Sequence, residues 1–269
     1  MTGPLRKIAE GREAEIYEWE DDRVLRLLRN PDAQTQIAWE LRAMQAARAA
    51  GVSVPAAYGA ATHDGRPGLI MDRVHGLDLL TIVGKQPWRI WWVGRVTGTL
   101  QAALHEVVAP AELPSIKDAY RRRMAGSPLV PEDVRRMAGE VLDGLPDGDR
   151  LCHGDFHPGN VITTEREPAI IDWTNVTRGD PMADYARTLL MMRTGSVPPG
   201  SPLVIRIGAH GLRGLMEGSY AGAYRRARPV DAELAQRWET VVAANRLADD
   251  IPEERGTLLK LLARRMKER

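Results

Sequence analysis

One segment near the middle of the chain constrains the fold more than any other. Residues 151–160 have the sequence LCHGDFHPGN and are followed by two short runs of branched residues and then by Asp172. The two runs have the composition of β-strands, and the polar residues between them, centred near Arg166, predict a turn. A hairpin with this centre places Asn160 opposite Asp172 at its open end. We therefore expect an amide and a carboxylate side by side, just after a polar loop.

These residue types favour a divalent cation. Mg²⁺ takes few protein ligands, prefers oxygen atoms and completes its shell with water, so Asn160 and Asp172 are candidate metal ligands. Asp155 lies on the loop before the first strand, where a carboxylate can reach a substrate hydroxyl and act as a general base. The alternative is a polar surface turn followed by a hairpin without catalytic function.

The composition is that of an ordinary globular protein. The chain has 269 residues, 43% apolar and 27% charged, with a net charge of +1. This length is sufficient for two lobes with a core, and the balanced charge gives no indication of a nucleic acid or membrane partner. A single cysteine and the lack of an apolar leader or membrane-spanning run lead us to expect a cytoplasmic protein.

The hydrophobic pattern changes about a quarter of the way along the chain. Residues 1–74 predict β-strands with one helix, and Asp64-Gly65 predicts a tight turn between the last two strands. In the first long helix that follows, we expect Trp91 and Trp92 on the buried side. Helices are expected over residues 88–108, 116–125, 131–143, 182–193, 202–226, 231–248 and 253–268.

Together, the loop and the two-part pattern resemble the aminoglycoside phosphotransferase and choline kinase-like family of the protein-kinase-like superfamily. The order H-x-D-x-x-x-x-N followed by Asp172 carries this resemblance, which is strongest over residues 151–187. It implies an α+β protein-kinase-like fold with two lobes. The expected nucleotide-binding lobe, residues 1–74, is a small antiparallel β lobe with one helix, and the expected catalytic and acceptor-binding lobe, residues 75–269, is larger and mostly helical.

The resemblance also implies an activity. The expected reaction is phosphorylation of a small-molecule hydroxyl by ATP, with GTP as an alternative, and with Mg²⁺. The acceptor would be an aminoglycoside-type antibiotic, an amino alcohol or a sugar, and the sequence does not choose among them. Asp155 matches the catalytic base, and Asn160 and Asp172 match the metal ligands. The implied partners are a nucleotide and the acceptor, without nucleic acid or membrane, in a monomer or homodimer.

Three positions of the first lobe are implied to contact the nucleotide directly. Gly11 lies where the phosphate-covering loop belongs, although the chain contains no G-x-G sequence. Asp72 and Val74 lie in the linker between the lobes, where the family forms backbone hydrogen bonds with adenine.

Asp180 and Asp184 resemble residues that support the catalytic loop, and Asp180 is also expected to cap a helix.

The main departure from the family is in the third strand. Arg26 stands where a lysine is expected, and Glu40 on the following helix is its implied partner. A planar guanidinium is not equivalent to a compact ammonium group at a phosphate. Three interpretations remain open: Arg26 binds the phosphates, Lys7 reaches in instead, or transfer has been lost and the chain is a non-catalytic nucleotide-binding module.

A third class of function is a zinc-dependent hydrolase. His153, Asp155 and His157 alternate in a spacing that suits zinc, but such a site needs further ligands and the other histidines are isolated in the sequence.

On the expected acceptor side, arginines interrupt a run of carboxylates, which favours a solvated face of mixed charge. These carboxylates are Glu217, Asp231, Glu233, Asp249, Asp250, Glu253 and Glu254.

Overall fold

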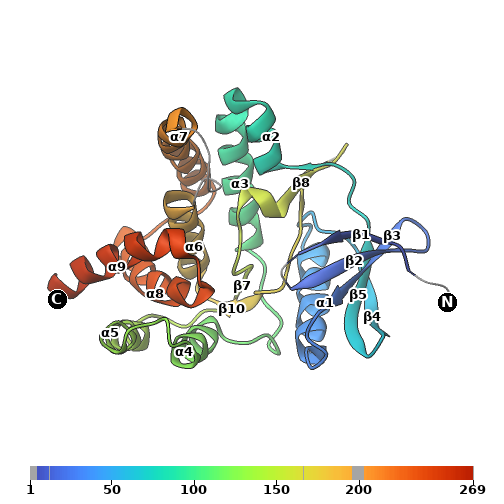
Figure 1. Cartoon of the computed structure of the whole chain (residues 1–269), viewed down its shortest axis with the longest axis horizontal. Coiled ribbons are helices and arrows are strands. Elements are labelled where there is room, and N and C mark those ends of the chain that lie inside the picture. Colours follow the sequence, from blue (N-terminus) through green and yellow to red (C-terminus); the bar gives the residue numbers. More distant parts are fainter. Residues whose placement is uncertain (1–4, 12, 166, 196–202, 269) are drawn as a thin grey trace.

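The computed structural model of the chain describes residues 5–11, 13–165, 167–195 and 203–268, with the backbone alone for residues 203–210. Five antiparallel strands form a sheet in the order β1-β2-β3-β5-β4. The sheet forms the β lobe at the right of Figure 1, beside helix α1. The elements are β1 (Lys7–Glu10), β2 (Ala14–Trp19), β3 (Arg23–Leu28), α1 (Gln34–Ala49), β4 (Ala57–His63) and β5 (Arg66–Asp72).

Local turn chemistry explains the hairpin of β4 and β5. His63 pairs with Arg66, so the loop contains only Asp64 and Gly65, and both have positive φ, 49° and 73°. A two-residue loop of this kind matches the right-handed twist of the strands and favours Asp-Gly. The predicted turn is confirmed.

The second lobe is mostly helical and lies at the left of Figure 1. Its helices are α2 (Leu79–Lys85), α3 (Ile90–Leu104), α4 (Ile116–Gly126), α5 (Glu132–Asp143), α6 (Pro181–Thr194), α7 (Leu203–Ala227), α8 (Ala232–Arg246) and α9 (Pro252–Lys267). Short 3₁₀ turns are η1 (Pro87–Arg89), η2 (Pro158–Asn160) and η3 (Leu247–Asp249). Short strands are β6 (Leu77–Asp78), β7 (Arg150–Cys152), β8 (Val161–Thr163), β9 (Ala169–Ile170) and β10 (Thr177–Gly179).

This arrangement confirms the predicted α+β fold with a β lobe and a helical lobe. The chain joins the second lobe soon after β5, because Leu77 and Asp78 of β6 pair with Thr163 and Ile162 of β8. The division between residues 74 and 75 stays a prediction. Within the described residues, no helix has both the length and the apolar character required to cross a membrane.

One expectation about α3 was wrong. Trp91 is 56% exposed, and the buried face of α3 instead includes Gly94, Thr97 and Gln101. The reason is a very close approach of α7. A Cβ atom on Gly94 would lie 2.6 Å from the carbonyl oxygen of Met216, so only a residue without a side chain fits there.

Candidate active site

A cavity of about 680 Å³ lies between the two lobes. Six of the eight predicted site residues line it, four from residues 1–74 and two from residues 75–269. These residues are Gly11, Arg26, Asp72, Val74, Asp155 and Asp172. Glu40 and Asn160 are buried behind this surface. Most of the predicted site residues, although far apart in the chain, thus lie at or behind one cavity.

Asp184 of α6 fixes the loop that carries Asp155. Its carboxylate accepts hydrogen bonds from the backbone N–H groups of His153 (2.9 Å) and Gly154 (2.8 Å) and from the side chains of Gln101 and His105 (both 3.2 Å). Burial alone would raise the pKa of Asp184, but hydrogen bonds and the neighbouring histidines outweigh it and lower the pKa to about 2. Asp184 is therefore a buried anion that holds the loop in place.

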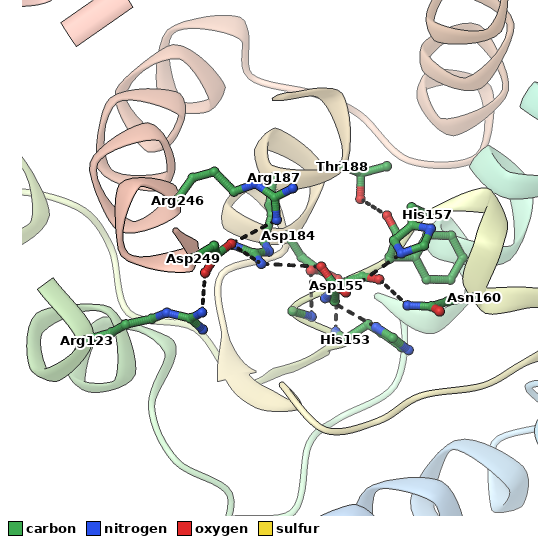
Figure 2. A network of polar contacts seen from close by, with 12 residues as sticks. Arg123, His153, Asp155, His157, Asn160, Asp184, Arg187, Thr188, Arg246 and Asp249 are labelled. Carbon is green, nitrogen blue, oxygen red and sulfur yellow. Dashed lines mark hydrogen bonds and ion pairs between the residues drawn. The ribbon is translucent and has the colours of Figure 1, made fainter. Parts of the chain in front are cut away.

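The same helix is capped at its start and contacts the loop at one further point. Asp180 caps α6 by accepting the N–H of Met182 (2.9 Å), ahead of Pro181 at the first helical position, as predicted. Thr188 donates its hydroxyl to the carbonyl of Phe156 at 2.8 Å. Asp184 and Thr188 are four residues apart and therefore lie on one helix face, which is directed at the loop (Figure 2).

The two histidines of the loop shape it. Nδ1 of His153 accepts the N–H of Asp155 at 3.3 Å, and its Nε2 lies 2.9 Å from the carbonyl of Ile171. Nδ1 of His157 accepts the N–H of Gly159 at 3.0 Å, and burial lowers the pKa of His157. Because three of these four ring nitrogens already have backbone partners, the two imidazoles do not form the zinc site that a hydrolase would need.

The catalytic hairpin forms, but its register differs from the expected one by one residue. Val161 pairs with Ile170, and the carbonyl of Asn160 accepts the N–H of Ile171 at 2.9 Å. Asn160 therefore faces Ile171, and Asp172 lies one residue beyond, with a positive φ of 61°. The expected turn centre, Arg166, is outside the described residues.

Asn160 and Asp172, at this end of the hairpin, each have their own hydrogen-bond partners. Nδ2 of Asn160 donates to the carbonyl of Asp155 at 2.9 Å, which leaves Oδ1 of the amide. Oδ1 of Asp172 accepts the hydroxyl of Thr174 at 2.6 Å and lies 3.4 Å from Nη2 of Arg26. Burial would raise the pKa of Asp172, but the charge of Arg26 and the hydrogen bond from Thr174 lower it below its ordinary value. Asp172 is thus ionised at neutral pH.

Arg26 forms the predicted pair with Glu40. Its Nη1 lies 2.8 Å and 3.2 Å from the two carboxylate oxygens, and both side chains are buried. Burial raises the pKa of Glu40 above its ordinary value. The other arm of the fork, Nη2, contacts Asp172 and the hydroxyl of Thr174. Arg26 therefore connects α1 to the end of the catalytic hairpin.

Lys7 is not placed to substitute for Arg26. Its Nζ pairs with Glu10 (2.8 Å) and Glu15 (3.4 Å), and Lys7 is not among the residues that line the cavity. The backbone N–H groups of two other candidates are already engaged: that of Gly11 donates to Ala14 (2.8 Å) and that of Asp72 to Ala56 (2.9 Å). Neither N–H group is available to a nucleotide in this conformation.

Four residues near Asp155 were not predicted as part of the site. Arg123, Arg187, Arg246 and Asp249 line the same cavity, and Figure 2 shows them on one side of Asp155 with His157 on the other. One of them carried a sequence signal: Arg187 is three residues after Asp184 and so lies on the helix face directed at the loop. The others come from α4, α8 and η3 and are brought together only by folding.

The chain matches the model of the phosphotransferase enzyme family over residues 4–230. The chain belongs to this family. Among curated protein sequences, none matches it.

Solved structures of the family share the fold at low sequence identity. An amicoumacin kinase in complex with AMP-PNP, Ca²⁺ and its antibiotic has a TM-score of 0.64 and 13% identity, covering 96% of this chain and 86% of that one. An aminoglycoside-3'-phosphotransferase of type VIII has a TM-score of 0.61 and 18% identity, covering 88% and 90%. A choline kinase from Cryptosporidium parvum has a TM-score of 0.59 and 12% identity, covering 98% and 89%.

Proposed function

We propose that this phosphotransferase-family protein transfers the γ-phosphoryl group of ATP to a hydroxyl of a small molecule, in the presence of Mg²⁺. The observation that carries the proposal is the meeting of Asp155, Asp172 and Arg26 at one cavity between the lobes. Phosphoryl transfer needs mainly positioning and charge stabilisation, and these three groups supply a base, an anion for the cation and a cation for the phosphates.

In the proposed reaction, Asp155 orients the acceptor hydroxyl and takes its proton. The hydroxyl oxygen forms a bond to the γ-phosphorus while the bond from that phosphorus to the bridging oxygen breaks, and ADP leaves. Arg26, held by Glu40, would contact the α and β phosphates. Its fork is already directed at Asp172, so a small rotation of the guanidinium would exchange that contact for phosphate oxygens.

The residues at the end of the hairpin fit a hard divalent cation. Oδ1 of Asn160 and Oδ2 of Asp172 remain after the hydrogen bonds described above, and an amide with a carboxylate is a donor set suited to Mg²⁺. A cation held by these two residues would offset the negative charge of the nucleotide phosphates. Gly11 of the turn between β1 and β2, with Asp72 and Val74 at the opposite wall, would enclose the nucleotide.

The test separates binding from transfer. We expect Asp155→Asn to bind Mg-ATP with an affinity within about twofold of wild type and to lose at least about 100-fold in transfer rate, because general base catalysis contributes roughly that much. Asp147→Asn, a change at an exposed carboxylate, is the matched control. Calorimetry with Mg-ATP and detection of labelled product measure the two effects. Undiminished transfer by Asp155→Asn would refute the assignment of the base, and binding without transfer by wild type would favour a non-catalytic nucleotide-binding module.

A further inference from the structure

Three arginines surround the acceptor side of Asp155. Arg123 of α4, Arg187 of α6 and Arg246 at the end of α8, here called the arginine cluster, line the cavity between the lobes together with Asp155. They lie on the opposite side of Asp155 from Asn160, away from the hairpin that would hold the nucleotide phosphates (Figure 2). Asp155 also lines a second cavity of about 610 Å³ together with His157, and of the three arginines only Arg246 lines that one. A group that reaches Asp155 through the cavity between the lobes therefore meets these side chains.

The arginine cluster converges on one carboxylate. Oδ2 of Asp249 lies 2.8 Å from Nη1 of Arg246 and 3.3 Å from Nη2 of Arg187, and Oδ1 of the same residue contacts Arg123. Arg246 is also held by Glu254, which accepts two hydrogen bonds of 2.9 Å. Glu254 is buried and does not line the cavity, so it supports Arg246 from behind.

Arg187 is the most deeply buried member. It is 3% exposed, and its Nη2 lies 3.3 Å from both Asp155 and Asp249. Its Nε and Nη1 are buried and have no hydrogen-bond partner in the described part of the chain. Buried donors without partners are costly, and a guanidinium in this state favours an anionic oxygen beside it.

The carboxylates that would attract a cationic acceptor lie elsewhere. Of the seven C-terminal carboxylates noted in the sequence, only Asp249 lines the cavity. Glu217 and Glu254 are paired with Arg193 and Arg246. Apart from Asp155, the three guanidinium groups are matched by two carboxylates, Asp249 at the cavity and Glu254 behind Arg246, so one positive charge remains on this side. Charge complementarity at such a surface excludes a polycation and favours an anion.

We infer that the acceptor carries a negatively charged group, a carboxylate or a phosphate, beside its reacting hydroxyl, and that the arginine cluster binds this group. The inference rests on the proposed function, since it names the substrate class of the same site. Arg187 is central and Arg123 lies at the rim, with 41% of its side chain exposed. Arginine recognises both carboxylate and phosphate through paired hydrogen bonds. The geometry therefore predicts a negative charge on the acceptor and does not distinguish a carboxylate from a phosphate.

The first experiment tests the anion site without knowledge of the acceptor. Sulfate and malonate are titrated into the protein at constant ionic strength, with and without saturating Mg-AMP-PNP, and the melting temperature is followed. We expect a saturable increase for wild type and for Arg122→Gln, an exposed arginine on the same helix that does not line the cavity. Arg123→Gln should shift the half-saturating concentration at least about fivefold, as expected for loss of one charged contact. Equal titrations for the two variants would overturn the inference.

The second experiment tests the acceptor with sets of related hydroxyl compounds that carry different charges. Glucuronate and glucose 6-phosphate are compared with glucose and glucosamine, and 4-hydroxybutyrate with 4-hydroxybutanamide and 4-aminobutanol, by calorimetry and by product formation. In each set we expect the anion to bind at least about tenfold more tightly than the cation, and Arg123→Gln to reduce the difference. A preference for the cation, or no preference, overturns the inference. The anion titration without nucleotide tests the arginine cluster alone. Failure of Mg-AMP-PNP to bind would therefore refute the proposed function separately from the inference about the anion site.

Discussion

Replacement of Asp184 by asparagine offers a quantitative test of how the catalytic loop is held. The pKa of this buried carboxyl falls from 3.8 to about 2 on folding, and a shift of that size corresponds to about 2.5 kcal/mol of stability at neutral pH. In the variant, an NH₂ group would also face at least one of the N–H donors of His153 and Gly154, which adds about 1–3 kcal/mol. We expect Asp184→Asn to lose about 3.5–5.5 kcal/mol and roughly 10–15 °C in Tm.

Urea unfolding followed by tryptophan fluorescence measures this loss, with Asp147→Asn as an exposed control that should change by less than about 1 kcal/mol. The folded pKa of Asp184 is depressed, so its stabilisation is complete above about pH 4 and is lost as the pH falls toward 2. The difference between wild type and variant should therefore be constant from pH 8 to pH 5. A loss below about 1 kcal/mol, or a difference that closes within this range, would refute the reasoning.

Two other substitutions test the nucleotide side and the loop backbone. Arg26→Lys keeps the charge but replaces a two-armed guanidinium by a single ammonium group, so one of the two contacts made by the fork is weakened. We expect the Kd for Mg-ATP to rise about tenfold with the fold retained; an unchanged Kd would show that the fork is not required for nucleotide binding. Gly154→Ala should destabilise the protein by more than about 3 kcal/mol, because a Cβ atom would lie 2.1 Å from a backbone oxygen at a positive φ of 78°. Gly65→Ala has a similar φ with open space around it, and urea unfolding should show a loss of only about 1 kcal/mol.

The sequence predicted the features that depend on short segments. The strands of the β lobe, the turn at Asp64-Gly65, the cap at Asp180 and the hairpin after Asn160 each follow from residues within about ten positions of one another. Propensity, turn chemistry and capping act at that range. The pairing of Arg26 with Glu40 was predicted through the family resemblance and not from such local rules.

The exact register of the catalytic hairpin could not be predicted in this way. The register depends on the number of residues in the loop between the two strands. In that loop the hydroxyl of Thr164 donates a hydrogen bond to the carbonyl of Glu167 (2.7 Å) and accepts one from its N–H (3.1 Å). A side chain that competes with strand pairing changes the loop length by one residue. The consequence is that Asn160 faces Ile171.

Long-range packing explains the other differences. Trp91 was expected in the core because of the amphipathic pattern of its helix, but the depth of α3 is decided by α7, more than a hundred residues later in the chain, which needs glycine at its closest approach. The arginine cluster is similar, since Arg123 and Asp249 are 126 positions apart. Neither periodicity nor spacing indicates a contact at that separation.

The division of contacts around Asp155 bears on how enzymes of this architecture diversify. Asp184 and Thr188 of α6 immobilise the reactive segment, whereas Arg123 and Asp249 approach from α4 and η3. Under the proposed function, we expect exchange of Arg123 and Asp249 to change which compounds are admitted while Asp184 and Thr188 still hold the segment with Asp155. A common scaffold can in this way gain a new selectivity through a few replacements on two separate elements, which is how one fold comes to serve many chemistries.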